Sequence, residues 1–153
     1  LYRRSLYTYW KRTLPPPSMA AFDAPNREIC TTERGVTNTP LQAFVLMNDP
    51  QFVESARAFA ERLLTGSSGS DEERLARAFE QVTSRQPAAD EQQVLVRALA
   101  RERRKYSTDP TGATALLEIG ESPRDLSLPP AEHAAWTNLC GMLLNLSETI
   151  TRR

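Results

Sequence analysis

Helix-start and helix-stop signals recur from Thr39 onward, and they constrain the fold of this 153-residue chain more than any other feature. Thr39, Pro40 and Gln42 match a capping box that has proline at the first helical position. The run Asn48-Asp49-Pro50 ends that short helix and begins another, and the run Ser70-Asp71-Glu72-Glu73 is a second capping box. The chain beyond Thr39 is therefore predicted to be a succession of helices.

Apolar side chains recur at helical spacing between these signals, as expected for helices that each bury one face. A long helix is predicted from Ala88 to about Tyr106, a short one after Asp109-Pro110, and a last one from about Ala131 to Leu146. The connections are short, so neighbouring helices are expected to pack antiparallel in a compact bundle-like domain. The predicted buried positions are Phe52, Ala56, Phe59, Leu63, Leu75, Phe79, Val82, Leu95, Leu99, Tyr106, Leu116, Leu117, Ile119, Trp136, Leu139, Cys140, Leu143 and Leu146.

Residues 1–38 show a different pattern, which indicates an extended or β segment. The runs 6–10 and 27–34 are rich in aromatic or β-branched side chains that favour strands, although the first run also shows helical spacing. The prolines from Pro15 to Pro17 predict an extended polyproline turn between these runs. We expect a mainly α fold, a single domain in which a small N-terminal two-strand β element packs on a helical part formed by residues 39–153.

Composition argues against several broad classes of protein. Nineteen basic residues balance nineteen acidic ones, so no net charge attracts the whole chain to nucleic acid or to an anionic membrane. No run of about 18 apolar residues is present, so no membrane-spanning segment is expected. Tyr7, Tyr9 and Trp10 alternate with basic residues, as in proteins that bind single-stranded nucleic acid. Packing of these aromatics on helices is the favoured interpretation, and we expect no nucleic-acid partner.

The residue types that most often carry catalysis or bind metals are sparse. His133 is the only histidine, and no H-E-x-x-H, G-x-S-x-G or phosphate-binding glycine loop is present, so His133 is interpreted as a surface imidazole and no metal site is predicted. Cys30 and Cys140 are the only cysteines. Two buried free thiols are the favoured interpretation, and a Cys30–Cys140 disulfide in an oxidising compartment is the alternative.

A group of charged residues lies in and beside the second predicted strand. Asp23, Glu28 and Glu33 could line a polar cleft together with Arg27 and Arg34. Such a cleft could be a buried network of ion pairs or could supply general acid and base groups. The spacing of these residues does not select a reaction.

Three long stretches carry a family resemblance: RRSLYTYWKRTLPPPSMAAFDAPNREICTTER, TNTPLQAFVLMNDPQFVESARAFAERLL and AAWTNLCGMLLNLSETITR. They resemble the planctomycete-specific C-terminal domain of unknown function that accompanies planctomycete cytochrome-c-type domains. The similarity extends from about Arg3 to the C-terminus. Because the chain begins at Leu1 rather than at methionine, it is interpreted as the C-terminal part of that domain, within a larger multidomain protein.

The resemblance implies a context more than an activity, since no reaction is established for that family. It implies an exported protein of the periplasm or cell envelope, whose partners are the upstream domains of the same polypeptide and other envelope proteins. It places haem c in a separate upstream module, because this chain lacks C-x-x-C-H, and no cofactor is expected here. The polar motif residues that helix capping does not explain are the candidate site: Asp23, Arg27, Glu28, Asn145 and Glu148.

Three hypotheses for function follow from these observations. The first is a non-catalytic helical module that serves assembly or presents a ligand. The second is part of a hydrolytic or redox active site, acting on extracellular polymers and completed by upstream residues. The third is a nucleic-acid binder that uses Tyr7, Tyr9 and Trp10, and it has the weakest support.

Overall fold

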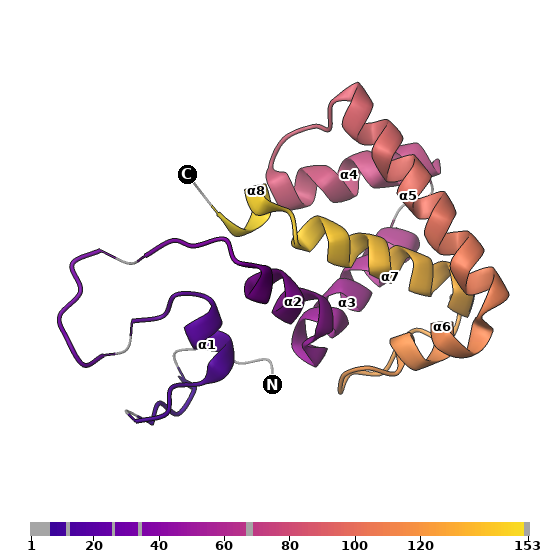
Figure 1. The fold of residues 1–153 in the computed structure, drawn as a ribbon. Coiled ribbons are helices and arrows are strands. Elements are labelled where there is room, and N and C mark those ends of the chain that lie inside the picture. Colours follow the sequence, from indigo (N-terminus) through magenta and orange to yellow (C-terminus); the bar gives the residue numbers. More distant parts are fainter. Residues whose placement is uncertain (1–6, 12, 26, 34, 67–68, 152–153) are drawn as a thin grey trace.

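The computed structural model describes residues 7–11, 13–25, 27–33, 35–66 and 69–151. These residues form eight helices and no strand, so the prediction of a mainly α fold is confirmed and that of a two-strand element is not (Figure 1). In chain order the helices are α1 (Pro17–Ala21), α2 (Pro40–Asn48), α3 (Pro50–Gly66), α4 (Asp71–Thr83), α5 (Ala89–Thr108), α6 (Pro110–Leu117), α7 (Pro130–Leu144) and α8 (Ser147–Ile150).

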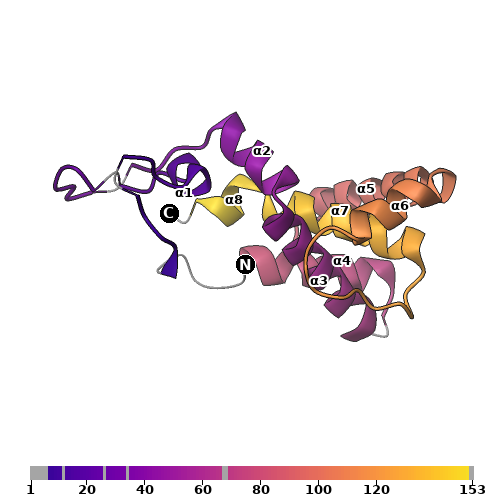
Figure 2. The same cartoon turned by 90° about the horizontal axis from the view of Figure 1, so that it is seen from below.

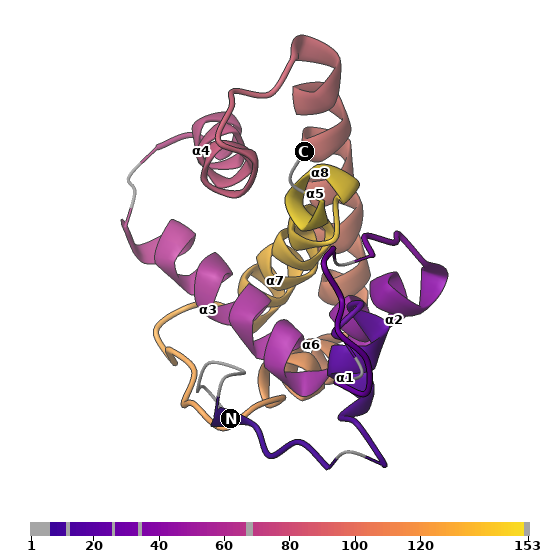
Figure 3. The same cartoon turned by 90° about the vertical axis from the view of Figure 1, so that its left-hand side faces the viewer.

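Helix α7 lies at the centre of the helical body. It packs against α3, α5, α6 and α4, and Figures 1 and 3 show it running between α3 and α5. A helix that is surrounded in this way must be apolar on nearly all sides, and the sequence of α7 meets that requirement. Trp136, Leu139 and Cys140 are fully buried, and the indole Nε1 of Trp136 donates a hydrogen bond of 2.8 Å to Glu132.

The surrounding helices bury the apolar positions that their spacing predicted. Helices α3, α4 and α5 each turn one stripe toward α7, and the opposite faces of these helices carry the charged residues. These stripes form one core with α7 and α6. The predicted positions that the structure buries are Ala56, Phe59, Leu63, Leu75, Phe79, Leu99, Tyr106, Leu117, Trp136, Leu139, Cys140 and Leu143.

The predicted capping boxes are both present. The hydroxyl of Thr39 accepts from the backbone N–H of Gln42 at 3.3 Å, and the Gln42 side chain accepts from the Thr39 N–H at 3.1 Å. Ser70 and Glu73 make the same reciprocal pair at the start of α4, with both distances 3.2 Å. These bonds satisfy backbone donors that the first turn of a helix otherwise leaves without partners.

The described part of the N-terminal segment, residues 7–38, corrects the β prediction. Its one β-bridge joins Lys11 to Leu14 inside a single tight turn, and the run 27–33 consists of bends and coil. Asp23 and Arg27 have left-handed backbone torsions, with φ of 57° and 62°, which interrupt an extended strand. β-branched residues favour a strand only where a partner strand is available, and this segment has none among its described residues.

The predicted polyproline turn is shorter than expected: Pro16 has extended torsions, with φ of −56° and ψ of 127°, but a helix begins at the next residue. Pro17 is the first residue of α1, a position at which proline is well tolerated because its missing N–H would be unpaired anyway. The segment leaves the helical body at one end, beside α2 and α8 (Figures 1 and 2). It touches that body through the rings of Phe22 and Phe52, whose centroids are 6.0 Å apart, and through a 3.0 Å hydrogen bond from Asn38 to Ser147.

Candidate functional site

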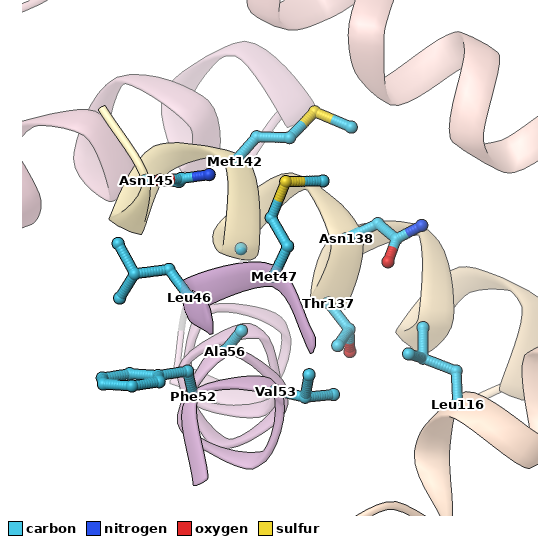
Figure 4. Close-up of a pocket in the computed structure, with 11 residues that line it drawn as sticks. Leu46, Met47, Phe52, Val53, Ala56, Leu116, Thr137, Asn138, Met142 and Asn145 are labelled. Carbon is cyan, nitrogen blue, oxygen red and sulfur yellow. The ribbon is translucent and has the colours of Figure 1, made fainter. Parts of the chain in front are cut away.

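An apolar groove with a volume of about 310 Å³ opens where α2, α3, α6 and α7 meet (Figure 4). We call it the α2–α7 groove. Helix α3 supplies its floor, α2 and α7 supply opposite walls, and Leu116 of α6 lies toward one end. Its lining consists of Leu46, Met47, Phe52, Val53, Ala56, Leu116, Thr137, Asn138, Gly141, Met142 and Asn145.

Helix α2, which supplies Leu46 and Met47 to the groove, carries exposed apolar side chains. This helix is apolar on nearly every side, yet Gln42 is its only buried residue. Leu41, Phe44 and Met47 are 59%, 63% and 62% exposed, and Met142 on α7 is partly exposed on the facing wall. Several large apolar side chains exposed side by side on a folded domain mark an interaction surface more often than a neutral one.

Three polar side chains lie along the α7 side of the groove. The amide nitrogen of Asn138 donates to the hydroxyl of Tyr106 at 2.8 Å and to Glu102 at 3.0 Å. The hydroxyl of Thr137 donates to a backbone carbonyl one turn earlier in α7. The amide nitrogen of Asn145 reaches the carbonyl of Ala43 on α2 at 3.5 Å, while its Oδ1 is buried without a hydrogen-bond partner among the described residues. This Oδ1 atom is therefore a buried acceptor that no described group uses.

Asp23 and Arg27, two of the predicted site residues, have local partners. The carboxylate of Asp23 accepts from the backbone N–H of Thr37 at 2.8 Å, from the Thr37 hydroxyl, and from Gln42 at 3.4 Å. Asp23 thus holds the segment that leads into α2. The guanidinium of Arg27 lies 4.8 Å from the centre of the Trp10 ring, as expected for a cation–π pair.

The other predicted site residues lie elsewhere. Glu148 accepts from Arg85 at 2.8 Å, and Arg85 also binds Glu91, so this group joins α8 to the α4–α5 connection. The Arg85 guanidinium lowers the pKa of both carboxyls, that of Glu91 to about 2. Glu28 is exposed in the N-terminal segment. Of the five predicted residues, Asn145 alone lines the α2–α7 groove.

Sequence reasoning missed a buried polar group that we call the Glu54–Arg57 cluster, formed by Glu54 and Arg57 of α3 with Ser122. Glu54 and Arg57 are each 3% exposed and lie 3.3 Å apart. The Glu54 carboxylate accepts from the N–H groups of Glu121 at 2.9 Å and Ser122 at 2.7 Å, and from the Ser122 hydroxyl. Arg57 donates to the carbonyls of Leu117 and Ser122, both at 2.7 Å.

The Glu54–Arg57 cluster fixes the connection between α6 and α7. Gly120 within this connection has a φ of 109°, and a side chain there would collide with the Glu54 carboxylate. Every ionised group of the cluster is bonded, as a buried pair requires. One signal of this cluster was present in the sequence. Glu54 and Arg57 are oppositely charged, lie three residues apart and flank the buried Ala56.

His133 is fully buried on α7, so its interpretation as a surface imidazole is wrong. The reason is that His133 lies on the face of α7 that packs against α3. Nε2 lies 3.4 Å from the carbonyl of Arg57 and 4.0 Å from Glu61, and Nδ1 has no partner among the described residues. Burial lowers the pKa of His133, which favours the neutral ring.

The two cysteines are both free. Cys140 is buried as predicted, and burial raises the pKa of its thiol. Cys30 is exposed, so the expectation that it is buried is wrong. Covalent haem c needs two thiols and a histidine in one short motif, whereas Cys140 and His133 lie in the core and Cys30 in the N-terminal segment, so the residues of this chain do not fit that group.

The described residues contain neither a metal-binding group of side chains nor a membrane-spanning helix. No group of three or more histidine, cysteine, aspartate or glutamate side chains is placed to hold a metal ion. No described helix has both the length and the apolar character that crossing a bilayer requires.

The described residues define an all-helical domain with an apolar groove, and comparison with known proteins identifies its family. The chain belongs to the family described as PSD1, a protein of unknown function (DUF1553), whose family model matches residues 1–99. The match contains α2 and α3, which supply one side of the groove, and the first two of the three resembling stretches. The third stretch, at 134–152, lies outside it. No curated protein and no solved structure matches the chain.

Proposed function

We propose that this domain is a non-catalytic docking module, in which the α2–α7 groove receives an apolar segment of another domain or protein. The observation that carries the proposal is the exposure of Met47, which lines the apolar groove, together with the exposure of Leu41 and Phe44 on the same helix. Covering a side chain of this size contributes about 1.5–3 kcal/mol, so three of them supply a large share of a specific interaction.

The composition of the groove suits a partner helix or an extended strand of apolar residues. Met47 and Met142 stand on facing walls, and methionine adapts its shape to irregular partners (Figure 4). The polar side chains of Thr137, Asn138 and Asn145 lie among the apolar residues of the lining. Groove-shaped sites of this kind combine apolar contact with a few polar anchors.

The wider setting of the proposal comes from the family resemblance. We propose that the module belongs to an exported, multidomain planctomycete protein of the periplasm or cell envelope, with haem c in a separate upstream cytochrome-c-type module. Its partners would be those upstream domains and other envelope proteins. The absence of a C-x-x-C-H motif in this chain supports a division of labour in which haem is bound elsewhere.

A photo-cross-linking experiment tests the docking proposal in the full-length protein. Benzoylphenylalanine replaces Phe44, which is 63% exposed, in one variant and Leu126, which is 79% exposed, in a control variant. We expect the probe at position 44 to form a defined cross-link to one apolar segment, identified by peptide mass spectrometry, and the probe at position 126 to form none. A probe at position 44 that reacts only within α2 would contradict the proposal.

A groove-filling variant sharpens this test. Gly141 lines the groove, and a Cβ added there would meet the Cβ of Ala56 at an ordinary 3.9 Å, so Gly141→Ala should fold normally. Gly141→Leu would place a larger side chain in the groove. We expect the position-44 cross-link to persist in Gly141→Ala and to be lost in Gly141→Leu, with circular dichroism confirming that both variants are folded.

A second candidate function is part of a hydrolytic or redox site on extracellular polymers. It is favoured by the left-handed backbone of Arg27, because non-glycine residues in this conformation occur preferentially at functional sites. The test is to replace Asp23, Arg27 and Glu28 singly in the full-length protein and to measure release of reducing ends or amines from soluble polymers. Turnover that survives each replacement undiminished would exclude this loop as the site.

A further inference from the structure

A second pocket, with a volume of about 280 Å³, lies between α3 and α4 on a different part of the surface from the α2–α7 groove. Two arginines from different helices line it, Arg62 from α3 and Arg77 from α4. Its remaining lining is formed by Leu63, Gly66 and Gln81.

Among the described residues, no carboxylate oxygen lies within 4.0 Å of the guanidinium of Arg62 or Arg77. Arg62 is held instead over the ring of Phe59, with 5.8 Å from its central carbon to the ring centre. The chain pairs most of its other structured arginines with carboxylates, as it does for Arg57, Arg74, Arg85, Arg101 and Arg103.

The acids that lie near these arginines in the sequence make other hydrogen bonds, and none of them forms an ion pair with Arg62 or Arg77. Glu61 accepts from the backbone N–H of Asp125 at 3.3 Å, on the side of α3 that faces His133. Glu73 belongs to the capping box of α4, and Glu80 accepts from Gln86 at 2.7 Å. Two positive charges therefore share one hollow in a chain whose formal net charge is zero.

We propose that Arg62 and Arg77 bind a tetrahedral oxyanion, the phosphate or sulfate group of a small ligand, in this pocket. Guanidinium groups present paired N–H donors in a plane that matches two oxygens of such a group. Gln81, whose side-chain amide is a further hydrogen-bond donor, and the apolar Leu63 also line the pocket. The volume is near the lower bound of about 300 Å³ for small-molecule sites, which suits a compact ligand.

Binding measurements on the full-length protein test this inference. Inorganic phosphate and sulfate are titrated by calorimetry, with sodium chloride at matched ionic strength as the reference. We expect saturable binding of at least one oxyanion, weakened roughly tenfold or more by Arg62→Gln and by Arg77→Gln, because each removes a charge-assisted donor. Arg104→Gln, which removes the same charge from an exposed position on α5, should leave the affinity unchanged.

Further variants and ligands identify the bound group and control for misfolding. Arg62→Lys and Arg77→Lys keep the charge but lose the paired donors, so an intermediate affinity supports recognition by geometry. The affinities for phenyl phosphate and inorganic phosphate are then compared. Tighter binding of phenyl phosphate would show that the site takes a phosphate ester, and equal affinities would show that it takes the free ion. Equal affinities in the Arg62, Arg77 and Arg104 variants would overturn the proposal, as would binding of acetate with the same affinity as phosphate. Because both arginines are exposed, all variants are expected to unfold at the same temperature.

Discussion

The helical body, residues 40–150, and the N-terminal segment, residues 7–38, use their side chains in opposite ways. The body buries large groups such as Trp136 and Leu139 completely, whereas none of the described residues of the segment is buried. Both contain apolar and aromatic residues, so composition does not separate them. The difference shows that burial here follows helical spacing, since a stripe repeated over several turns can be covered by α7 while short apolar runs cannot.

The two regions also differ in how far apart their bonded residues are in sequence. The body is held by bonds such as those between Glu54 and Ser122, which are 68 positions apart. Within the segment the bonds are shorter in range, as between Asp23 and Thr37, 14 positions apart, although Asn38 at its end bonds the distant Ser147. Stability is therefore expected to be concentrated in the body, and the following predictions test that expectation from the largest effect to the smallest.

The largest effect is expected for Glu54→Ala in the body. The substitution leaves the buried Arg57 charge without its partner, and breaking a buried pair in this way costs about 3–5 kcal/mol of unfolding free energy. Denaturant unfolding measures the loss. Glu118→Ala, at an exposed position of the same charge, should change the free energy by less than about 0.5 kcal/mol. Similar small losses for both variants would show that the Glu54–Arg57 cluster does not stabilise the body.

Protonation of His133 is expected to lower the unfolding free energy by a smaller amount. Burial lowers the pKa of this residue, so the unfolded chain binds a proton more readily than the folded one. The stability that comes from the neutral ring is complete above the unfolded pKa of about 6.5, and it falls as the pH drops below that value, by at most about 1.4 kcal/mol per pH unit.

Thermal or denaturant unfolding between about pH 7 and pH 5 checks this dependence. His133→Gln keeps a donor for the Arg57 carbonyl but does not titrate, so its stability should be flat over the same range. Asp71 and Glu148 have lowered pKa values because of Arg103 and Arg85, and they lose their contribution only at more acidic pH. If the unfolding free energy of the unmodified protein and of His133→Gln changes equally with pH, His133 is not the group that causes the pH dependence.

The junction between the two regions should respond more weakly. Thr39→Ala removes the cap of α2 and is expected to cost about 1 kcal/mol, measured by denaturant unfolding. Thr32→Ala changes the same residue type at an exposed position of the segment and should have no measurable effect. If the two variants are equally stable, the capping box does not hold α2 in place.

The smallest effect is expected within the segment itself. Ile29 is 72% exposed, so Ile29→Ser should change the unfolding free energy by less than about 0.5 kcal/mol. In a paired strand the same change would cost up to about 1 kcal/mol through lost cross-strand packing. A loss of that size would revive the two-strand interpretation and would weaken the contrast between the two regions.

The outcome of the sequence predictions follows the range of the interactions involved. Caps and apolar stripes depend on residues three or four positions apart, so the capping boxes at Thr39 and Ser70 were predictable. A strand depends on a partner that the sequence does not specify, and the left-handed torsions at Asp23 and Arg27 were not visible in it. The Glu54–Arg57 cluster was missed for the same reason, since its partner Ser122 is brought close only by the packing of α6 and α7.

The candidate site was predicted only in part. The resemblance directed attention to Asn145, which lines the α2–α7 groove, but it gave equal weight to Glu148, which binds Arg85 on another side of the molecule. The groove itself combines residues from four helices. Apolar positions such as Phe44 and Met47 look like core residues in a sequence, and their exposure becomes apparent only when α2 is placed against its neighbours.

The central position of α7 has a consequence for how the family should be delimited. The match to the family model ends at residue 99, inside α5, and therefore excludes the helix against which α3, α4 and α5 all pack. A polypeptide cut at that residue would expose the apolar stripes of Phe59, Leu63 and Phe79 to water. The smallest unit able to fold must extend through Leu144, so the conserved-sequence boundary and the physical boundary of this domain are different places in the chain.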